Sequence, residues 1–292
     1  MAATESAHTW GRWGADDEKG TVNLISPEKI RQAAALVRDG RSISVSRPFP
    51  TEPGPANPRP ASQALMREAK PGGAGASLEY LGFAYHGVSC THVDALCHCW
   101  GPDGMWGGRN PDDVLDPGGS SWGGIEQWRH GIITRGVLLD VPGFRGTSCV
   151  ELDRPVRSVE LYAIAEAQGV TVSAGDAVLI YCGRDAWDAS HPEWGSEPSR
   201  PGLHASCLEF LERRDVAVLG WDMMDAVPNE EGQAFGVHAA IFRLGLALVD
   251  NCELSELTAM CHQQNRWEFM FVVSPLWLTR GTGSPANPLA IL

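Results

Sequence analysis

Residues 86–100 carry more metal-binding side chains than any other segment of the chain. The stretch reads HGVSCTHVDALCHCW and contains three histidines, one carboxylate and three cysteines. His92 and Asp94 are two positions apart, so on an extended strand both side chains point to the same face. An imidazole and a carboxylate on one face can share a cation, and this spacing therefore predicts a metal site.

His98 cannot join the same ion if the strand continues straight, because each residue advances an extended chain by about 3.3 Å. The chain must therefore turn after Asp94. If a helix begins there, Asp94 and His98 become neighbours on one helix face. Such nitrogen and oxygen donors suit zinc or manganese better than calcium or copper(I). The H-x-D-x(3)-H spacing also occurs among ordinary buried polar residues, so the spacing alone does not establish a metal site.

The charge of the chain restricts its partners. With 292 residues and a formal net charge of -13, the chain is poorly suited to bind nucleic acid or anionic membranes, which are bound chiefly through Lys and Arg. A small-molecule substrate is the expected partner. The first residues show no secretory signal, and the longest apolar stretch, residues 269–278, is too short to span a bilayer. We therefore expect a cytoplasmic protein, in which the eight cysteines are reduced thiols.

Apolar runs and helical segments alternate along most of the chain. A Ser-Pro pair at residues 26–27 begins an expected helix that ends at Gly40, and a short strand follows at 42–46. Further strands are expected at 137–141, 176–182, 216–220, 246–251 and 268–275. Helices are expected at 159–169, 204–214, 237–245 and 253–260. This alternation predicts an α/β fold, and we find no internal boundary, so residues 1–292 are expected to form a single domain.

One long segment interrupts this pattern. Residues 48–76 are rich in Pro, Gly and Ala and show no hydrophobic period. A loop of this length inside a domain is either a lid over a functional site or a surface excursion. Tryptophans cluster in irregular segments nearby, and Trp13 and Trp100 are the candidates to line a pocket for a flat, apolar substrate.

Two later residues can complete a metal site. His238 lies in the segment GVHAA, and Asp250 ends the apolar run LALVD twelve positions further on. A carboxylate at the end of an apolar strand is where α/β folds place functional residues. A buried structural imidazole remains the alternative for His238.

At these residues the chain resembles the putative cyclase superfamily of metal-dependent hydrolases, which includes bacterial kynurenine formamidases and isatin hydrolases. The family motif H-x-G-T-H-x-D-x-P-x-H matches residues 88–98, VSCTHVDALCH. The segments WGADDEKGTVNL, GDAVLIYCGR, PGLH and GTGSPANPLAI also resemble parts of larger members, so the likeness covers nearly the whole chain. It implies one domain with a mixed central sheet flanked by helices.

The resemblance also implies roles for individual residues. His92 and Asp94 fall on metal ligands of the family, and His98 falls on its catalytic acid/base. His238 and Asp250 fall on the later His and Glu ligands, at the same separation in the sequence. The resemblance further implies a symmetric assembly, so a homodimer or homotetramer is expected.

Three positions depart from the family motif. Its first His ligand is Val88 here, its Gly is Cys90, and its distal Glu is the shorter Asp250. His86 has the same parity as Val88 on a strand, and Cys90 offers a thiolate, so both are possible extra ligands. We expect one ion of zinc or manganese in preference to two, and a metal-free site is the remaining alternative.

The expected function is metal-dependent hydrolysis of an amide, lactam, lactone or ester bond in a small aromatic or cyclic substrate. A divalent ion can lower the pKa of water to about 7 and polarise a carbonyl, and His98 can then transfer the proton. Two alternatives stay open. One is a biosynthetic cyclase or dehydratase that acts on a carbonyl substrate, and the other is a non-catalytic small-molecule binding protein on the same fold.

Overall fold

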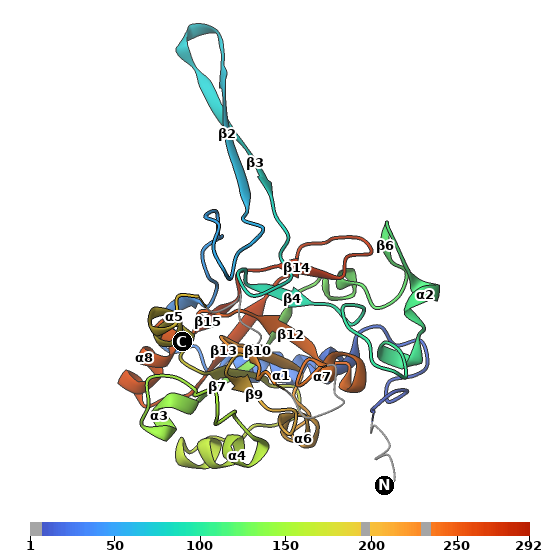
Figure 1. Cartoon of the computed structure of the whole chain (residues 1–292), viewed down its shortest axis with the longest axis vertical. Coiled ribbons are helices and arrows are strands. Elements are labelled where there is room, and N and C mark those ends of the chain that lie inside the picture. The colour runs from blue at the N-terminus through green and yellow to red at the C-terminus, as the bar shows by residue number, and fades with distance from the viewer. Residues whose placement is uncertain (1–7, 194–198, 229–234) are drawn as a thin grey trace.

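A mixed sheet of nine strands lies at the centre of the computed structural model, which describes residues 8–193, 199–228 and 235–292 (Figure 1). Its strands in chain order are β1 (Ser42–Ser44), β4 (His92–Asp94), β7 (Ile132–Asp140), β8 (Ala177–Tyr181), β10 (Val218–Trp221), β12 (Ala247–Asp250), β13 (Glu268–Val273), β14 (Gly283–Pro285) and β15 (Leu289–Ile291). The remaining strands of the described ranges form three two-stranded sheets: β2 (Ser62–Ala69) with β3 (Gly75–Gly82), β5 (Leu115–Asp116) with β6 (Gly119–Ser120), and β9 (Gly202–Leu203) with β11 (Met224–Asp225).

The spatial order of the large sheet is β1-β15-β13-β7-β8-β10-β12-β4-β14. The four central strands β7, β8, β10 and β12 are parallel to their neighbours in this group, and the other pairs are antiparallel. Strands covered on both faces read as continuous apolar runs, as β8 does with the sequence AVLIY. The expected α/β class with a mixed central sheet is therefore confirmed.

Eight α-helices are present in the described ranges. They are α1 (Pro27–Ala34), α2 (Pro111–Val114), α3 (Val141–Arg145), α4 (Ser158–Ala167), α5 (Arg184–Ser190), α6 (Cys207–Arg213), α7 (Ala239–Leu244) and α8 (Ser255–Gln264). Helix α1 packs on β7 and β13, whereas α4 contacts α3, α6 and β7. Figure 1 shows α3, α4 and α6 on the side of the body opposite the β2–β3 hairpin. None of these helices is both long and apolar enough to cross a membrane.

The expected helix ends are right for α7 and wrong for α1. Helix α7 stops at Gly245, which adopts φ 70° as the left-handed cap. Helix α1 begins as expected, with the Ser26 side chain accepting a hydrogen bond from the Lys29 amide. It ends at Ala34 rather than Gly40, because the amides of Leu36 and Val37 bond carbonyls only three residues back and the last turn tightens.

Residues 48–76 are only partly irregular, so the expectation of a loop over this whole range is corrected. The segment enters the antiparallel hairpin of β2 and β3, in which Met66 lies opposite Leu78. Gly72 and Gly73 have φ of 78° and 81° in the turn between the strands. The hairpin projects from the body (Figure 1), and every residue of β2 is exposed. A strand without a buried face needs no alternation of polar and apolar residues, so its sequence carries no period.

The eight cysteines are all free thiols, as expected.

The N-terminal turn at Gly20 packs directly on the end of α7. This contact predicts that substituting Gly20 lowers the stability of the protein more than substituting Gly40 does. A side chain at Gly20, where φ is 58°, would overlap the carbonyl oxygen of Gly245. Gly40 has a similar φ of 66° but open space around it. Gly20→Ala should therefore lower the free energy of unfolding in urea by about 3 kcal/mol, and Gly40→Ala by about 1 kcal/mol. Equal losses would show that the close approach contributes nothing.

Candidate metal centre

The pairing of β4 with its neighbours sets the first part of the site. In the antiparallel register of β4 and β12, His92 lies opposite Asp250. Residues directly opposite each other point to the same face of a sheet, so Asp250 faces the side that His92 and Asp94 share. The His92 Nε2 atom lies 3.3 Å from Asp94 Oδ1 and 3.8 Å from Asp250 Oδ2. The parity argument from the sequence is therefore confirmed.

The chain turns after Asp94, as predicted, but it forms no helix there. The amide of His98 donates to the carbonyl of Ala95 at 3.0 Å and closes a single turn. The amide of Cys97 donates instead to the carbonyl of Gly123 at 3.1 Å, so the hydrogen bonds of a continuing helix cannot form. This turn still returns His98 to the site, with Nε2 3.7 Å from Asp94 Oδ1.

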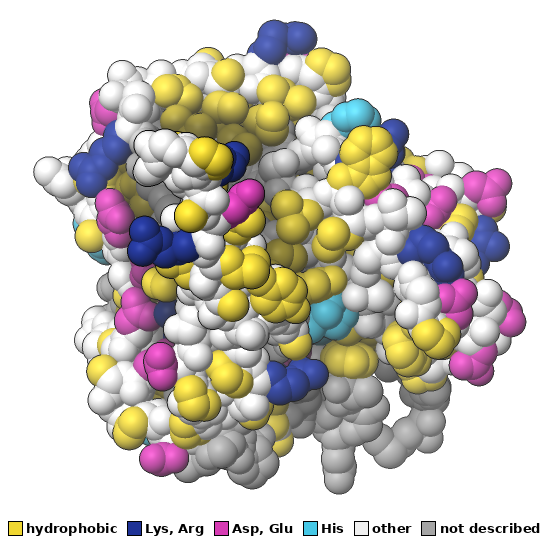
Figure 2. Space-filling model, turned by 90° about the horizontal axis from the view of Figure 1, so that it is seen from above, with side chains coloured by type: hydrophobic (Ala, Val, Ile, Leu, Met, Phe, Trp, Pro, Cys, Tyr) yellow, Lys and Arg dark blue, Asp and Glu magenta, His cyan; other side chains and the backbone are white. Residues whose placement is uncertain are grey.

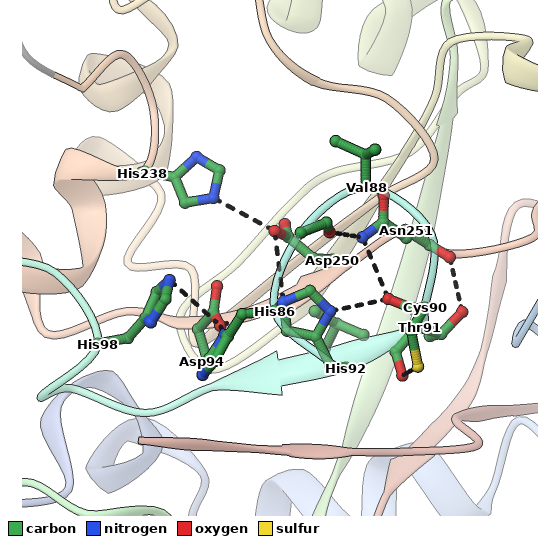
Figure 3. A network of polar contacts seen from close by, with 12 residues as sticks. His86, Val88, Cys90, Thr91, His92, Asp94, His98, His238, Asp250 and Asn251 are labelled. Carbon is green, nitrogen blue, oxygen red and sulfur yellow. Dashed lines mark hydrogen bonds and ion pairs between the residues drawn. The ribbon is translucent and has the colours of Figure 1, made fainter. Parts of the chain in front are cut away.

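His86 occupies the site, although Val88 stands at the corresponding position of the family motif. His86 Nδ1 lies 2.9 Å from Asp94 Oδ1. Its ring stacks on that of His98 with centroids 3.9 Å apart and an interplanar angle of 7°. Its Nε2 atom lies 3.0 Å from the hydroxyl of Thr282. The imidazole missing at position 88 is thus supplied from two positions earlier in the sequence (Figure 3).

Cys90, the other extra ligand considered from the sequence, is not part of the cluster. The two groups of potential ligands in the described residues comprise His86, His92 and Asp94, and Asp94, His238 and Asp250. Within each group the ligand atoms lie within 4.8 Å of one another. The Cys90 thiol contacts the carbonyl of Thr91 at 3.5 Å, and burial raises its pKa to about 11. Asp94 belongs to both groups, an arrangement that accommodates either one ion or two.

His238 and Asp250 are held by residues that the sequence did not single out. His238 Nε2 lies 3.2 Å from Asp250 Oδ2, and its Nδ1 lies 2.6 Å from Asp225 Oδ2. Asp225 also accepts the backbone amides of Val237 and His238. The indole of Trp221 donates to Asp250 Oδ1. A carboxylate behind a histidine fixes the orientation and tautomer of the ring in many metal sites.

Asp94 provides the observation that tests whether a cation fits. Its side chain is fully buried, and neither carboxylate oxygen has a hydrogen-bond partner among the described residues. The surrounding imidazole nitrogens approach Oδ1 without hydrogen-bond geometry. A buried carboxylate whose oxygens accept no hydrogen bond is destabilising, whereas a divalent ion would satisfy both oxygens. The imidazole and carboxylate donors match zinc or manganese.

The charges of the cluster shift its pKa values in opposite directions. Burial alone would raise the pKa of Asp94, but the imidazoles of His92, His98 and His86 hold it well below its usual range. Burial opposes protonation of His92, yet Asp94 and Asp250 raise its pKa to about 9. The pKa of His98 is lowered to about 4, chiefly by burial and with a contribution from the neighbouring histidines. His98 is therefore neutral and able to accept a proton near pH 7.

Asn251 and Arg184 hold the irregular segment that carries His86. The Asn251 amide donates to the carbonyls of Gly87 at 2.5 Å and Cys90 at 3.1 Å. The buried guanidinium of Arg184 donates to Asn251 Oδ1 at 2.7 Å and to the carbonyl of Val88 at 2.5 Å. The Cys90 carbonyl also accepts His92 Nδ1–H at 2.8 Å, which leaves Nε2 free to face Asp94. One amide and one guanidinium thus position two imidazoles.

A cavity of about 180 Å³ opens beside His86. Its walls come from residues 55–59, Ala84 and residues 86–89. Viewed from the hairpin side, the body has a recess with many hydrophobic side chains around it (Figure 2). Trp100 follows His98 closely in the chain and is 44% exposed. Trp13 packs near Trp106 and Arg12 instead, so its expected role in substrate binding stays a prediction without a supporting contact.

Asp225, Trp221, Asn251 and Arg184 were missed by sequence reasoning. A usable signal existed for Asp225, because WDMMD follows the apolar run of β10 and places carboxylates at the end of a parallel strand. Asn251 directly follows Asp250, the candidate ligand. Nothing in the sequence linked Arg184 to the segment of His86, since 96 residues separate it from Val88.

Comparisons with known proteins were consistent with this geometry. The family model described as "Putative cyclase" matches residues 24–226, more than half of the chain. The crystal structure of a novel cyclase superposes with a TM-score of 0.89 at 26% identity and covers 100% of both chains. No curated protein gives a significant match to the sequence.

Two more distant structures share the fold. An isatin hydrolase bound to the product analogue thioisatinate has a TM-score of 0.56 and 17% identity, over 92% of this chain and 98% of its own. A protein described as a potential metal-dependent hydrolase with cyclase activity has a TM-score of 0.52 and 16% identity, over 86% of this chain and 98% of its own. The family match stops before His238 and Asp250, so it does not cover these two residues, and their place in the site rests on the contacts described above.

The ligand arrangement predicts which variants lose metal. Asp94→Asn removes the charge common to both ligand groups and should abolish stoichiometric zinc or manganese, measured by elemental mass spectrometry on untagged protein. His86→Ala should weaken binding, because it removes one donor of the first group. Cys90→Ser is the matched control in the same segment and should retain the wild-type metal content. Loss of metal in Cys90→Ser, with retention in His86→Ala, would reverse the assignment of the extra ligand.

The contacts of Asn251 predict an effect on metal affinity without loss of a ligand. Asn251→Asp keeps the size of the side chain and suits the left-handed backbone, with φ 55°. It replaces the amide that donates to the carbonyls of Gly87 and Cys90 with a carboxylate, which cannot donate. Metal affinity, measured by competition with a chromophoric chelator, should fall by about 10- to 100-fold. The control is Asn265→Asp, the same change at another left-handed position, φ 48°, on the exposed end of α8. Equal metal affinities for Asn251→Asp and Asn265→Asp would show that Asn251 does not position the ligands.

Proposed function

The chain belongs to the putative cyclase family, and we propose that it is a metal-dependent hydrolase that cleaves an amide, lactam, lactone or ester bond. The proposed substrate is small and aromatic or cyclic. The observation that carries this proposal is the buried carboxylate of Asp94, which accepts no hydrogen bond from the described residues. Three imidazoles lie near Asp94, and a fourth, that of His238, lies near Asp250.

The residues that would hold the ion are those of the two ligand groups. They are His86, His92, Asp94, His238 and Asp250. When bound there, a divalent ion would polarise a substrate carbonyl and make water a better nucleophile at neutral pH. Asp225 holds the ring of His238 with Nε2 directed at Asp250, so Nε2 is the nitrogen that would bind the ion. Asn251 does the same for His92 through the Cys90 carbonyl.

His98 is the proposed acid/base. It belongs to neither of the two ligand groups, and its side chain is 26% exposed. An imidazole in this position can accept a proton from the attacking water and return it to the leaving group, as hydrolysis requires. The stacking of His86 on His98 fixes the plane of the ring and so limits the directions in which this proton can move.

The proposed substrate class rests on the cavity beside His86. Its volume of about 180 Å³ lies below the usual range of ligand pockets, which favours a small substrate. Pro55, Ala56 and Pro58 line it with apolar surface, and Arg59 contributes a positive charge that suits a carbonyl or the carboxylate product. The shared fold of an isatin hydrolase makes cyclic amides the first compounds to examine.

The test is a panel of formyl-amides, isatin-like lactams, aryl lactones and aryl esters, assayed in water labelled with oxygen-18. We expect turnover with one labelled oxygen in the product, loss of turnover on chelation and recovery on adding zinc or manganese. His98→Ala should lower kcat by about 10²- to 10⁴-fold with unchanged metal content. His130→Ala, a change at an exposed histidine, is the control.

Two results would overturn this assignment. Loss of metal from His98→Ala would make His98 a ligand rather than the acid/base. Ring closure or dehydration without uptake of labelled oxygen would replace hydrolysis by cyclase chemistry at the same site.

A further inference from the structure

The ring of His86 is held by the segment that enters β14. His86 Nε2 lies 3.0 Å from the hydroxyl of Thr282, and the carbonyl of Thr282 accepts the amide of Ala95 at 3.0 Å. Gly283 follows Thr282 and pairs with Asp94 in the register of β14 and β4. A Cβ atom at Gly283 would lie 2.8 Å from Cε1 of His86, so the missing side chain leaves room for the imidazole. The strand pairing that positions Asp94 therefore also positions His86.

Tyr85 determines the direction of the hydrogen bond between Thr282 and His86. The Tyr85 hydroxyl donates to the carbonyl of Gly283 at 2.9 Å, so its oxygen remains available as an acceptor. Burial raises the pKa of Tyr85, and a hydrogen bond from the Thr282 hydroxyl opposes this rise. A hydroxyl carries one proton, and Thr282 donates its proton to Tyr85. The Thr282 oxygen is then the acceptor for His86, whose Nε2–H is the donor.

This direction leaves Nδ1 of His86 as an acceptor that faces a second acceptor. A neutral imidazole carries one N–H, so protonation at Nε2 leaves a lone pair on Nδ1. That atom lies 2.9 Å from Asp94 Oδ1. Both atoms are buried, and neither has a hydrogen-bond partner among the described residues. Two buried acceptors at this distance repel each other unless a cation binds both.

We propose that Thr282, oriented by Tyr85, is a positioning residue that keeps the proton of His86 on Nε2 and presents Nδ1 to the metal ion. His92 presents the opposite nitrogen, because its Nδ1 lies 2.8 Å from the Cys90 carbonyl and its Nε2 faces Asp94. The centre would thus combine one histidine bound through Nδ1 with others bound through Nε2. The proposal rests on the metal centre of the proposed function, but not on which bond that centre cleaves.

The first experiment measures zinc affinity by competition with a chromophoric chelator on untagged proteins. Thr282→Val keeps the shape of the side chain but removes the acceptor, and it should weaken zinc binding by about 10- to 100-fold. Thr282→Ser restores the hydroxyl and should bind zinc as tightly as the wild type. Thr258→Val is the matched control, because the buried Thr258 hydroxyl donates to the carbonyl of Leu254 within α8 at 2.7 Å. The control should keep wild-type affinity.

A double-mutant cycle separates positioning from a general loss of structure. If Thr282 acts through His86, adding Thr282→Val to His86→Ala should cause no further loss of zinc affinity. A merely structural role for Thr282 would weaken zinc binding equally in both backgrounds. Equal losses in the two backgrounds would therefore overturn the proposal, as would wild-type affinity in Thr282→Val or an equal loss in Thr258→Val.

A crystal structure of the zinc-loaded wild type provides a test that needs no variant. Zinc should lie about 2.0–2.1 Å from Nδ1 of His86, with Nε2 still hydrogen-bonded to Thr282. Zinc bound to Nε2 of His86, or zinc without contact to this ring, would overturn the positioning role alone. A wild type that binds no zinc or manganese would overturn the metal centre of the proposed function and this proposal together.

Discussion

The antiparallel pairing of β4 with β12 is the interaction on which the site depends. It sets His92 opposite Asp250 and directs Asp94 to the same face. Because β12 belongs to the buried parallel centre of the sheet, the position of Asp250 is fixed by the core. The three-residue strand β4 is held between β12 and β14, so the positions of His92 and Asp94 are fixed as well. A rigid sheet thus positions a ligand cluster that short irregular segments complete.

Carboxylates and amides outside the cluster determine how its imidazoles are presented. Asp225 fixes His238, and the Asn251 side chain, braced by Arg184, fixes the segment between His86 and His92. Asp225 lies in β11, which follows β10, Asn251 follows the end of β12, and Arg184 begins α5 after β8. These contacts account for the position of His86 in a segment without regular structure. Although Val88 replaces the family histidine, Asp94 therefore still has an imidazole beside it at this point, that of His86.

Several features could be predicted from the sequence because they depend on neighbours in the chain. The common face of His92 and Asp94 follows from strand parity, and the buried parallel strands follow from continuous apolar runs such as that of β8. The predicted turn after Asp94 is present but is not the start of a helix, because the amide of Cys97 donates to the carbonyl of Gly123. Residues 48–76 were expected to be a loop, although 62–69 form β2 and Gly75 begins β3, because strands exposed on both faces leave no alternating pattern.

The sequence by itself determined the α/β class, and it predicted a metal site in residues 86–98 and the return of the chain after Asp94. It also identified His238 and Asp250 as candidates. Only the tertiary structure chose His86 over Cys90 and brought Asp225, Asn251 and Arg184 behind the ligands. The physical reason is that parity and periodicity report local geometry, whereas these contacts join segments separated by up to 164 residues. Their positions are set by sheet order and by hydrogen bonds between distant loops.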